Sequence, residues 1–229
     1  LARFAARFAD FSVAPETLAL TCAMVARGEA DALVPERVWQ ELSRGLMERR
    51  PSRMIEVLDA SGLPVRLFPE LRPPLTAGPG LDAAAQRGLP LAARFAIMAS
   101  GAVSAQALGG LQAKLRADAD SAAMARLLHE LRAPLVDARG APSMLSVLER
   151  ADALRRPQRF ETLLSALEAL DGVDPGSRGR RWRAALAAAA GVDAGGIAAK
   201  AGAQPDAIAA AIAAARRAAI EAAEAGGRR

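Results

Sequence analysis

Apolar side chains recur every three to four residues along most of the chain, which is the spacing of one face of an α-helix. After Pro35, for example, Val38, Leu42 and Leu46 follow one another at intervals of four. Proline often stands where such a segment begins, because its fixed φ suits the first turn of a helix. No stretch alternates apolar and polar residues long enough to indicate a β-strand. The pattern therefore predicts an all-α protein, built as a multi-helix bundle.

The predicted helices cover 1–10, 15–28, 35–46, 51–62, 81–87, 90–100, 121–132, 180–190 and 205–225, with two more that start at Pro142 and Pro157. We expect a short apolar turn over 63–68, and Gly109-Gly110 is expected to weaken the segment around it. Proline and glycine are densest in the stretch PELRPPLTAGPG, which starts at Pro69. We therefore predict a helical unit over 1–70, a linker over 71–80 and a second helical unit over 81–229.

Composition strengthens the all-α prediction and adds a charge pattern. Ala and Leu dominate the apolar residues, and both favour helices. The net charge is +5, and all but two of the basic residues, Lys114 and Lys200, are arginine. Residues 1–70 hold slightly more acidic than basic side chains, so the positive charge lies in the rest of the chain. Such an excess suits a polyanion such as RNA. Arginine and alanine richness also travel together with genome composition, so charge alone leaves both explanations open.

Cys22 is the single cysteine. An intrachain disulfide and a cysteine-based metal site are therefore excluded, which agrees with a cytoplasmic location. The alanine-rich stretches are interrupted before the roughly 20 residues that a membrane span requires, and we see no signal peptide at the N-terminus. We expect a cytoplasmic protein that has no contact with a membrane.

Enzyme-like residues are few. His129 is the single histidine, which excludes sites built from two imidazoles. Asp118-Ala119-Asp120 has the DxD spacing that can hold Mg²⁺ in phosphoryl transfer. The triplet lies between helical segments, however, where Asp120 or Ser121 is a natural N-cap. We expect neither a metal site nor a catalytic residue here, and we expect His129 to be a surface or half-buried side chain.

Arginine is the more informative residue. Arg37 and Glu41 are four apart, so they share one helix face and can form a surface ion pair or brace a neighbouring element. Arg3 and Arg7 lie on the polar face of the first helix. Further clusters follow at Arg155, Arg156 and Arg159, at Arg178, Arg180, Arg181 and Arg183, and at Arg216 and Arg217. The cluster at 178–183 surrounds Trp182, and an arginine beside an aromatic ring can hold a phosphate and stack a base. The alternative is a solvated helix face with Trp182 packed in the core.

Four stretches of the chain resemble the C-terminal part of the bacterial CCA-adding tRNA nucleotidyltransferases, the class that includes poly(A) polymerase. They are ARFAARFADFSVAPETLAL, VPERVWQELSRGL, PSRMIEVLDASGLPVRLFPEL and LERADALRRPQRFETLL. The second is similar to the R-x-x-x-E motif of the family's neck, with Arg37 and Glu41 at the two matching positions. The resemblance implies that 1–70 is an RNA-binding neck and that 81–229 forms the body and tail.

The resemblance also places chemistry elsewhere. The family's catalytic head, with its metal-binding carboxylates and E-D-x-x-R motif, is expected upstream of Leu1, so Mg²⁺ and CTP or ATP are expected only with that head. Some members carry an HD phosphohydrolase domain, and LDAAAQRGLPLAARFAIMASGA resembles its start. This chain has Ala99-Ser100-Gly101 where the family has HD-L-G-K, and His129 is similar to a lone surviving histidine. We therefore expect a degenerate HD-like body, no phosphohydrolase activity and no nucleotidyl transfer by this chain alone.

The favoured hypothesis is the tRNA-binding and scaffolding portion of a CCA-adding nucleotidyltransferase, with tRNA and a catalytic head as partners. Its candidate RNA contacts are Arg3, Arg7, Arg155, Arg156, Arg159, Arg178, Arg180, Arg181, Trp182 and Arg183. A second hypothesis is a degenerate pseudo-enzyme that serves as a helical protein-interaction module. A third, residual phosphatase chemistry at His129 with Asp118 and Asp120, has the weakest support.

Overall fold

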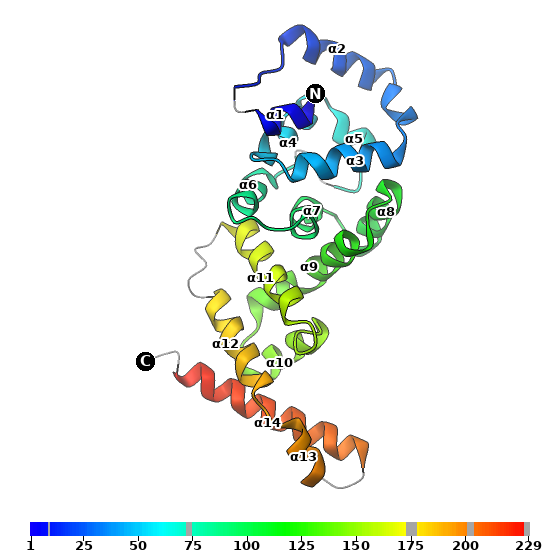
Figure 1. Ribbon diagram of the computed structural model, residues 1–229. Helices are drawn as coiled ribbons and strands as arrows, with labels where there is room; N and C mark the ends of the chain where they lie inside the picture. The colour runs from blue at the N-terminus through cyan, green and yellow to red at the C-terminus, as the bar shows by residue number, and fades with distance from the viewer. Residues whose placement is uncertain (9, 72–74, 173–177, 201–203, 227–229) are drawn as a thin grey trace. The chain divides into compact units, whose positions relative to one another are not determined.

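A computed structural model of the chain describes residues 1–229 apart from 9, 72–74, 173–177, 201–203 and 227–229 (Figure 1). The first helices are α1 (Ala2–Arg7), α2 (Pro15–Ala26), the 3₁₀ turn η1 (Glu29–Ala32), α3 (Pro35–Leu46), α4 (Pro51–Ala60), α5 (Leu63–Leu67), α6 (Gly78–Gln86) and α7 (Leu91–Ala99). They are followed by α8 (Ala105–Leu115), α9 (Ala119–Asp137), α10 (Gly140–Arg150), α11 (Pro157–Asp171), α12 (Arg178–Ala190), α13 (Ala194–Lys200) and α14 (Pro205–Gly226). Among these described residues the only β-type pairing is an isolated bridge between Leu71 and Ala102. The prediction of an all-α protein is confirmed.

Several helices form where the sequence predicts a turn or a weak segment. Residues 63–67 form the short helix α5, and α13 forms between the helices predicted at 180–190 and 205–225. The segment with Gly109 and Gly110 is helical in full, because the Ser104 hydroxyl accepts a hydrogen bond from the Ala107 N–H (3.1 Å) and caps the helix. Glycine lowers the helix propensity of this segment, and the burial of other side chains on α8 offsets that loss.

The chain divides into two compact units, one of residues 1–130 and 165–173, the other of residues 131–164 and 174–229. The predicted linker over 71–80 lies inside the first unit, and its end forms the first turn of α6. Helices on either side of it pack together, since Asp82 on α6 accepts hydrogen bonds from the Ser52 N–H (3.0 Å) and hydroxyl (2.7 Å) on α4. The domain boundaries taken from the sequence stay a prediction.

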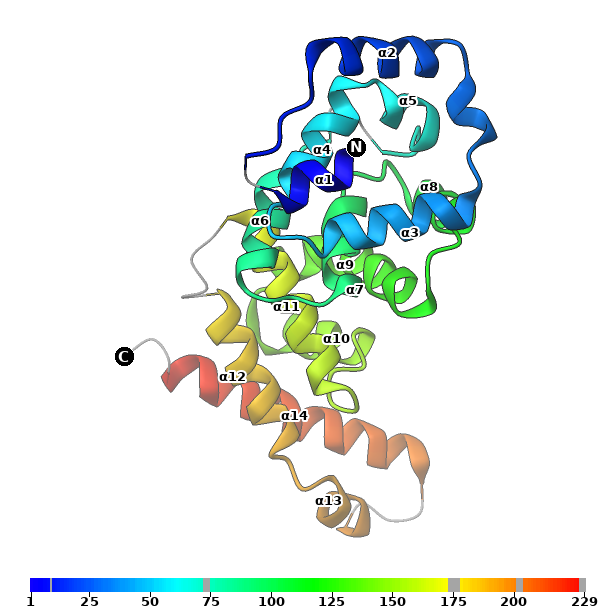
Figure 2. The ribbon, with the colours of Figure 1, turned by 45° about the horizontal axis from the view of Figure 1, so that its top comes forward.

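The core of the first unit forms where α3 packs on α7. The Trp39 and Phe95 rings pack in a T-shaped pair, with centroids 5.0 Å apart, and Leu42 and Leu46 of α3 are buried. Figures 1 and 2 both show α1 beside α3 and α4, and close contacts join α1 to each. The apolar stripe predicted after Pro35 is therefore the inner face of α3, and its polar face is left for other contacts.

Gly80 sets the approach of α6 to the end of α11. A Cβ at this position would lie 3.1 Å from the Leu170 Cα and 3.2 Å from the Ala169 carbonyl oxygen, both backbone atoms. We expect Gly80→Ala to lower the unfolding free energy by about 1–3 kcal/mol, because backbone must shift to admit the methyl group. Urea denaturation followed by circular dichroism measures the change. Gly109→Ala is the matched control, since its Cβ meets nothing within 4 Å and the substitution should stabilise α8 by about 0.5–1 kcal/mol. Equal unfolding midpoints for both variants would contradict the packing argument.

The second unit is organised by Trp182 of α12. Its side chain is fully buried, it donates its indole N–H to the Leu135 carbonyl (3.0 Å), and it meets the Phe160 ring edge-on at 6.1 Å. Helix α14 packs on α10 and α12, with Ile220 buried. The Trp182 indole of α12 therefore contacts both the end of α9 and α11.

Candidate nucleic-acid interface

Arg37 and Glu41 of α3, which the sequence analysis predicts to form the neck motif, do not pair with each other. Glu41 instead accepts a hydrogen bond from the Arg3 Nε of α1 (2.8 Å) and has Arg44 at 3.8 Å. The hydrogen bond from Arg3 holds the pKa of the Glu41 carboxyl below its ordinary value. The surface pair predicted within α3 is thus replaced by a bridge between α1 and α3, because α1 brings a second guanidinium to the same carboxylate.

Arg37 keeps its charge uncompensated. It is exposed, and no described residue forms a hydrogen bond or ion pair with it. It lines an apolar groove whose floor includes Val38, Leu58 and Leu67. A free guanidinium at the rim of an apolar groove can bind an anion that approaches from solvent.

The three arginines around the start of α11 have different roles. Arg159 donates to the Ala151 carbonyl (2.7 Å) and helps to close the turn after α10. Arg156 pairs with Asp152, four residues before it (3.3 Å). Arg155 is exposed and has no partner among the residues that the structure describes. Of this cluster, Arg155 is the side chain most available to a phosphate.

The arginines of α12 also differ in whether they have a partner within the protein. Arg181 binds Glu224 and donates to the Ala138 carbonyl (3.0 Å), while Arg183 binds Glu161 (2.6 Å). Arg178 also has an interaction within the protein. Arg180 is exposed and unpaired within the described ranges. Burial of Trp182 decides between the two alternatives raised by the sequence, because a ring with no exposed face cannot stack on a base.

The Asp118–Asp120 triplet and His129 are the residues that the sequence offers for metal binding or catalysis, and both lie on or next to α9. Asp118 caps α9 by accepting hydrogen bonds from the Ser121 N–H (2.9 Å) and hydroxyl (2.8 Å), so Asp118 takes the capping role expected of Asp120 or Ser121. His129 is half-buried on α9, as predicted. In the described part of the chain, no three or more His, Cys, Asp or Glu side chains lie close enough together to hold a metal ion. No described helix has the length and apolar character needed to cross a membrane.

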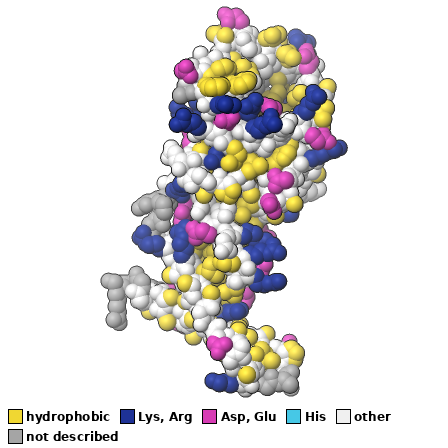
Figure 3. Space-filling model, viewed as in Figure 1, with side chains coloured by type: hydrophobic (Ala, Val, Ile, Leu, Met, Phe, Trp, Pro, Cys, Tyr) yellow, Lys and Arg dark blue, Asp and Glu magenta, His cyan; other side chains and the backbone are white. Residues whose placement is uncertain are grey.

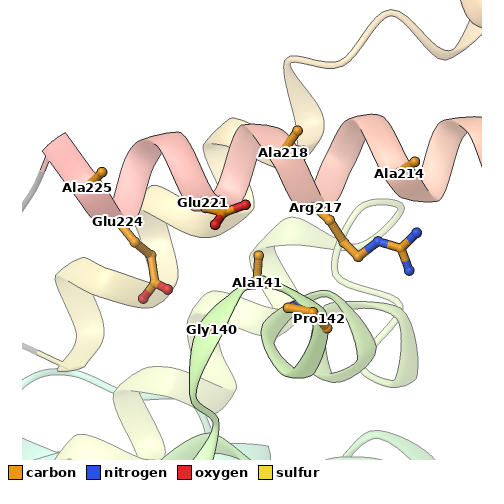
Figure 4. Close-up of a pocket in the computed structure, with 9 residues that line it drawn as sticks. All are labelled: Gly140, Ala141, Pro142, Ala214, Arg217, Ala218, Glu221, Glu224 and Ala225. Atoms are coloured by element: carbon orange, nitrogen blue, oxygen red, sulfur yellow. The ribbon is translucent and has the colours of Figure 1, made fainter.

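A groove that sequence reasoning missed lies in the second unit, between the start of α10 and the later turns of α14 (Figure 4). Arg217, Glu221 and Glu224 line it, together with alanines, Gly140 and Pro142. Figure 4 shows the Arg217 and Glu224 side chains leaving α14 in different directions. Because acidic and basic groups are mixed and Glu224 already binds Arg181, the groove has no clear preference for an anion.

Comparison with known proteins identifies the chain's relatives. Residues 10–74 match the profile of a family described as "Probable RNA and SrmB- binding site of polymerase A". The chain is 48% identical over 166 residues to a CCA-adding enzyme of Bordetella pertussis, a match that covers 72% of this chain and 45% of that enzyme. The chain is homologous to part of the CCA-adding enzymes. The resemblance found in the sequence is confirmed.

Two relatives described as multifunctional CCA proteins show a similar coverage. A multifunctional CCA protein of Leptothrix cholodnii is 43% identical over 72% of this chain and 48% of its own length, and one of Paraburkholderia phytofirmans is 41% identical over 72% and 49%. The chain thus spans about half the length of these relatives. No solved structure matches it significantly.

Proposed function

We propose that this chain binds tRNA as the RNA-binding portion of a CCA-adding nucleotidyltransferase, acting in the cytoplasm. The observation that carries the proposal is the 48% identity to a CCA-adding enzyme. The match of residues 10–74 to an RNA-binding family supports it. In this proposal the chain positions the RNA, and nucleotide transfer belongs to a catalytic head.

The exposed arginines supply the electrostatic part of binding. Arg155 and Arg180 project their guanidinium groups into solvent without a carboxylate partner among the described residues. A guanidinium in this state can donate two parallel hydrogen bonds to a phosphate without first breaking an internal ion pair. Arg155 and Arg180 are therefore more available to a phosphate than Arg156, Arg181 and Arg183, which already hold carboxylates. Those three position helices rather than RNA.

The neck motif has a separate role in this proposal. Glu41 fixes α1 on α3 through Arg3, and Arg37, which has no partner among the described residues, is available to contact the head or the RNA. Mg²⁺ and CTP or ATP belong with the head, so no residue of this chain is assigned to them. The region after α6 is interpreted as a degenerate HD-like body, with His129 in no catalytic role.

Filter binding with a tRNA lacking its terminal CCA tests the proposal. We expect submicromolar binding at 50 mM salt and steep weakening at 200 mM, because phosphate contacts release counterions. Arg155→Gln and Arg180→Gln should each weaken binding by roughly three- to tenfold and reduce the salt slope by about one. Lys200→Gln removes the same charge from α13 and should change little. No tRNA affinity at 50 mM salt would reject the proposal.

The alternative of a helical protein-interaction module makes the opposite prediction. Several large apolar side chains are exposed on the first unit, Leu20, Leu33, Val34 and Val65 among them. Docking through such a surface is governed by apolar burial, so it should strengthen slightly or stay constant as salt rises. A partner retained at 200 mM salt by a chain that binds no tRNA would favour this alternative.

A further inference from the structure

Two phenylalanine rings lie stacked on the surface of the first unit. Phe4 and Phe8, one helical turn apart on α1, have centroids 6.1 Å apart and planes inclined by 19°. They are 41% and 45% exposed, although the periodic pattern of the sequence assigns both to an apolar helix face. Aromatic rings are scarce in this protein, with six Phe, two Trp and no Tyr. Two of these few rings are therefore partly exposed to solvent.

Guanidinium groups surround this pair. Arg3 lies over the Phe4 ring at 5.0 Å and Arg7 over the Phe8 ring at 5.3 Å. Arg7 is exposed and has no carboxylate partner in the described structure. Figure 3 shows apolar and basic side chains next to one another over the region of α1. The surface thus combines aromatic rings with the positive charge of Arg7, whereas Arg3 is already paired with Glu41.

Two further arginines join from the turn between α3 and α4. The Arg50 N–H donates to the Ala6 carbonyl (3.1 Å), which holds this turn against the end of α1. The side chains of Arg49 and Arg50 are exposed and unpaired as far as the structure describes the chain. Sequence reasoning passed over both, although two arginines directly before a helix-starting proline were a visible signal.

The surface formed by Phe4 and Phe8, here called the platform, is held in place by contacts from neighbouring side chains. The Arg53 guanidinium donates to the Phe8 carbonyl (2.9 Å) and to the Phe11 carbonyl, and the Phe11 ring lies 6.3 Å from Phe4. Arg3 fixes the same helix to α3 through Glu41. A preformed surface loses little conformational entropy when a ligand binds, which favours a recognition role.

We propose that Phe4 and Phe8 stack an unpaired nucleobase of single-stranded RNA while Arg7, Arg49 and Arg50 bind its flanking phosphates. The inference rests on the proposed function, which it extends to a defined contact. Single strands expose base faces that a duplex hides, and proteins bind them with aromatic rings and arginine planes. Charge complementarity favours RNA over an apolar protein segment. Arg7 lies over the Phe8 ring, the turn that carries Arg49 and Arg50 is held against the end of α1, and an apolar segment would give these three guanidinium groups, unpaired among the described residues, no anion to bind.

Phe8→Leu is the decisive variant, because leucine keeps an apolar side chain and removes the ring face. We expect it to weaken binding of an RNA hairpin with a single-stranded 3′ overhang by roughly five- to hundredfold. Binding of the same RNA made fully duplex should not change. An overhang with abasic nucleotides should bind the parent protein and Phe8→Leu equally. Val103→Ala, an exposed apolar side chain outside this surface, is the matched control.

The outcomes separate the two proposals. If tRNA binds with the expected salt dependence but Phe8→Leu binds the overhang as tightly as the parent, the platform is rejected and the proposed function stands. Equal losses on duplex, abasic and overhang RNA also reject it, since the ring would then act through the fold or an apolar contact. If no RNA binds at all, both proposals fail. Unchanged amide hydrogen exchange of α3 and α7 shows that Phe8→Leu keeps the first unit folded.

Discussion

Replacing Trp182 by alanine is expected to lower the unfolding free energy of the second unit by about 3–5 kcal/mol. The fully buried indole packs on Phe160, and its N–H satisfies the Leu135 carbonyl. Alanine would leave a cavity and an unpaired buried acceptor at once. Because a whole domain is stable by only about 5–15 kcal/mol, this single change should leave α12 and α14 poorly protected.

Amide hydrogen exchange of α12 and α14 measures this effect directly. Trp182→Phe separates its two causes, since phenylalanine keeps most of the ring and loses the hydrogen bond, with an expected cost of about 1–3 kcal/mol. Arg180→Gln is the control on the same helix, because its side chain is exposed and unpaired within the described part. Unchanged exchange in Trp182→Ala would show that the indole does not organise this unit.

Replacing Arg94 by methionine is expected to destabilise the first unit by about 2–4 kcal/mol. Arg94 lies on α7 and is only 5% exposed. Its guanidinium donates to the carbonyls of Leu89 (2.8 Å), Leu46 (2.8 Å) and Glu48 (3.3 Å). Burial lowers the pKa of this guanidinium. The positive charge lies at the C-terminal end of α3, where the helix dipole is negative, so its loss leaves that end of the helix without its donor.

The expected result is faster exchange at the end of α3 and in α7, measured by amide hydrogen exchange. Arg94→Lys should recover only part of the stability, because an ammonium group cannot reproduce the planar fork that reaches three carbonyls. Arg49→Gln removes an exposed guanidinium from the nearby turn and should leave exchange in α7 unchanged. Full stability in Arg94→Met would mean that the burial cost of the charge outweighs its hydrogen bonds.

Fold class and most helix starts were readable from the sequence because both depend on local chemistry. Pro15, Pro35, Pro51, Pro157 and Pro205 each begin a helix. Gly28 and Gly62 adopt the left-handed conformation that ends a helix segment, with φ of 81° and 72°. Where local signals were weak, as at Gly109 and Gly110, burial against the rest of the unit decided the outcome.

The ion-pair partners of the charged residues could not be predicted from the sequence. The i, i+4 spacing correctly places Arg37 and Glu41 on one face of α3, but the carboxylate binds Arg3, which is 38 positions earlier in the chain. In the clusters at 155–159 and 178–183, Arg155 and Arg180 have no partner among the described residues, whereas Arg156, Arg181 and Arg183 hold carboxylates and Arg159 donates to a carbonyl. Free and paired arginines are identical in sequence, so only three-dimensional neighbours distinguish them.

The sequence by itself determined the helical class, the residues at which most helices begin and the homology with the CCA-adding enzymes. These properties depend on local propensity and on residue order. The tertiary structure alone decided that Trp182 is buried and that Phe4 and Phe8 are exposed. Both outcomes concern aromatic residues on amphipathic helices, and periodicity gives the side of a helix on which each lies without showing what covers that side. That side is covered by segments distant in the sequence, as where Trp182 donates its indole N–H to the Leu135 carbonyl.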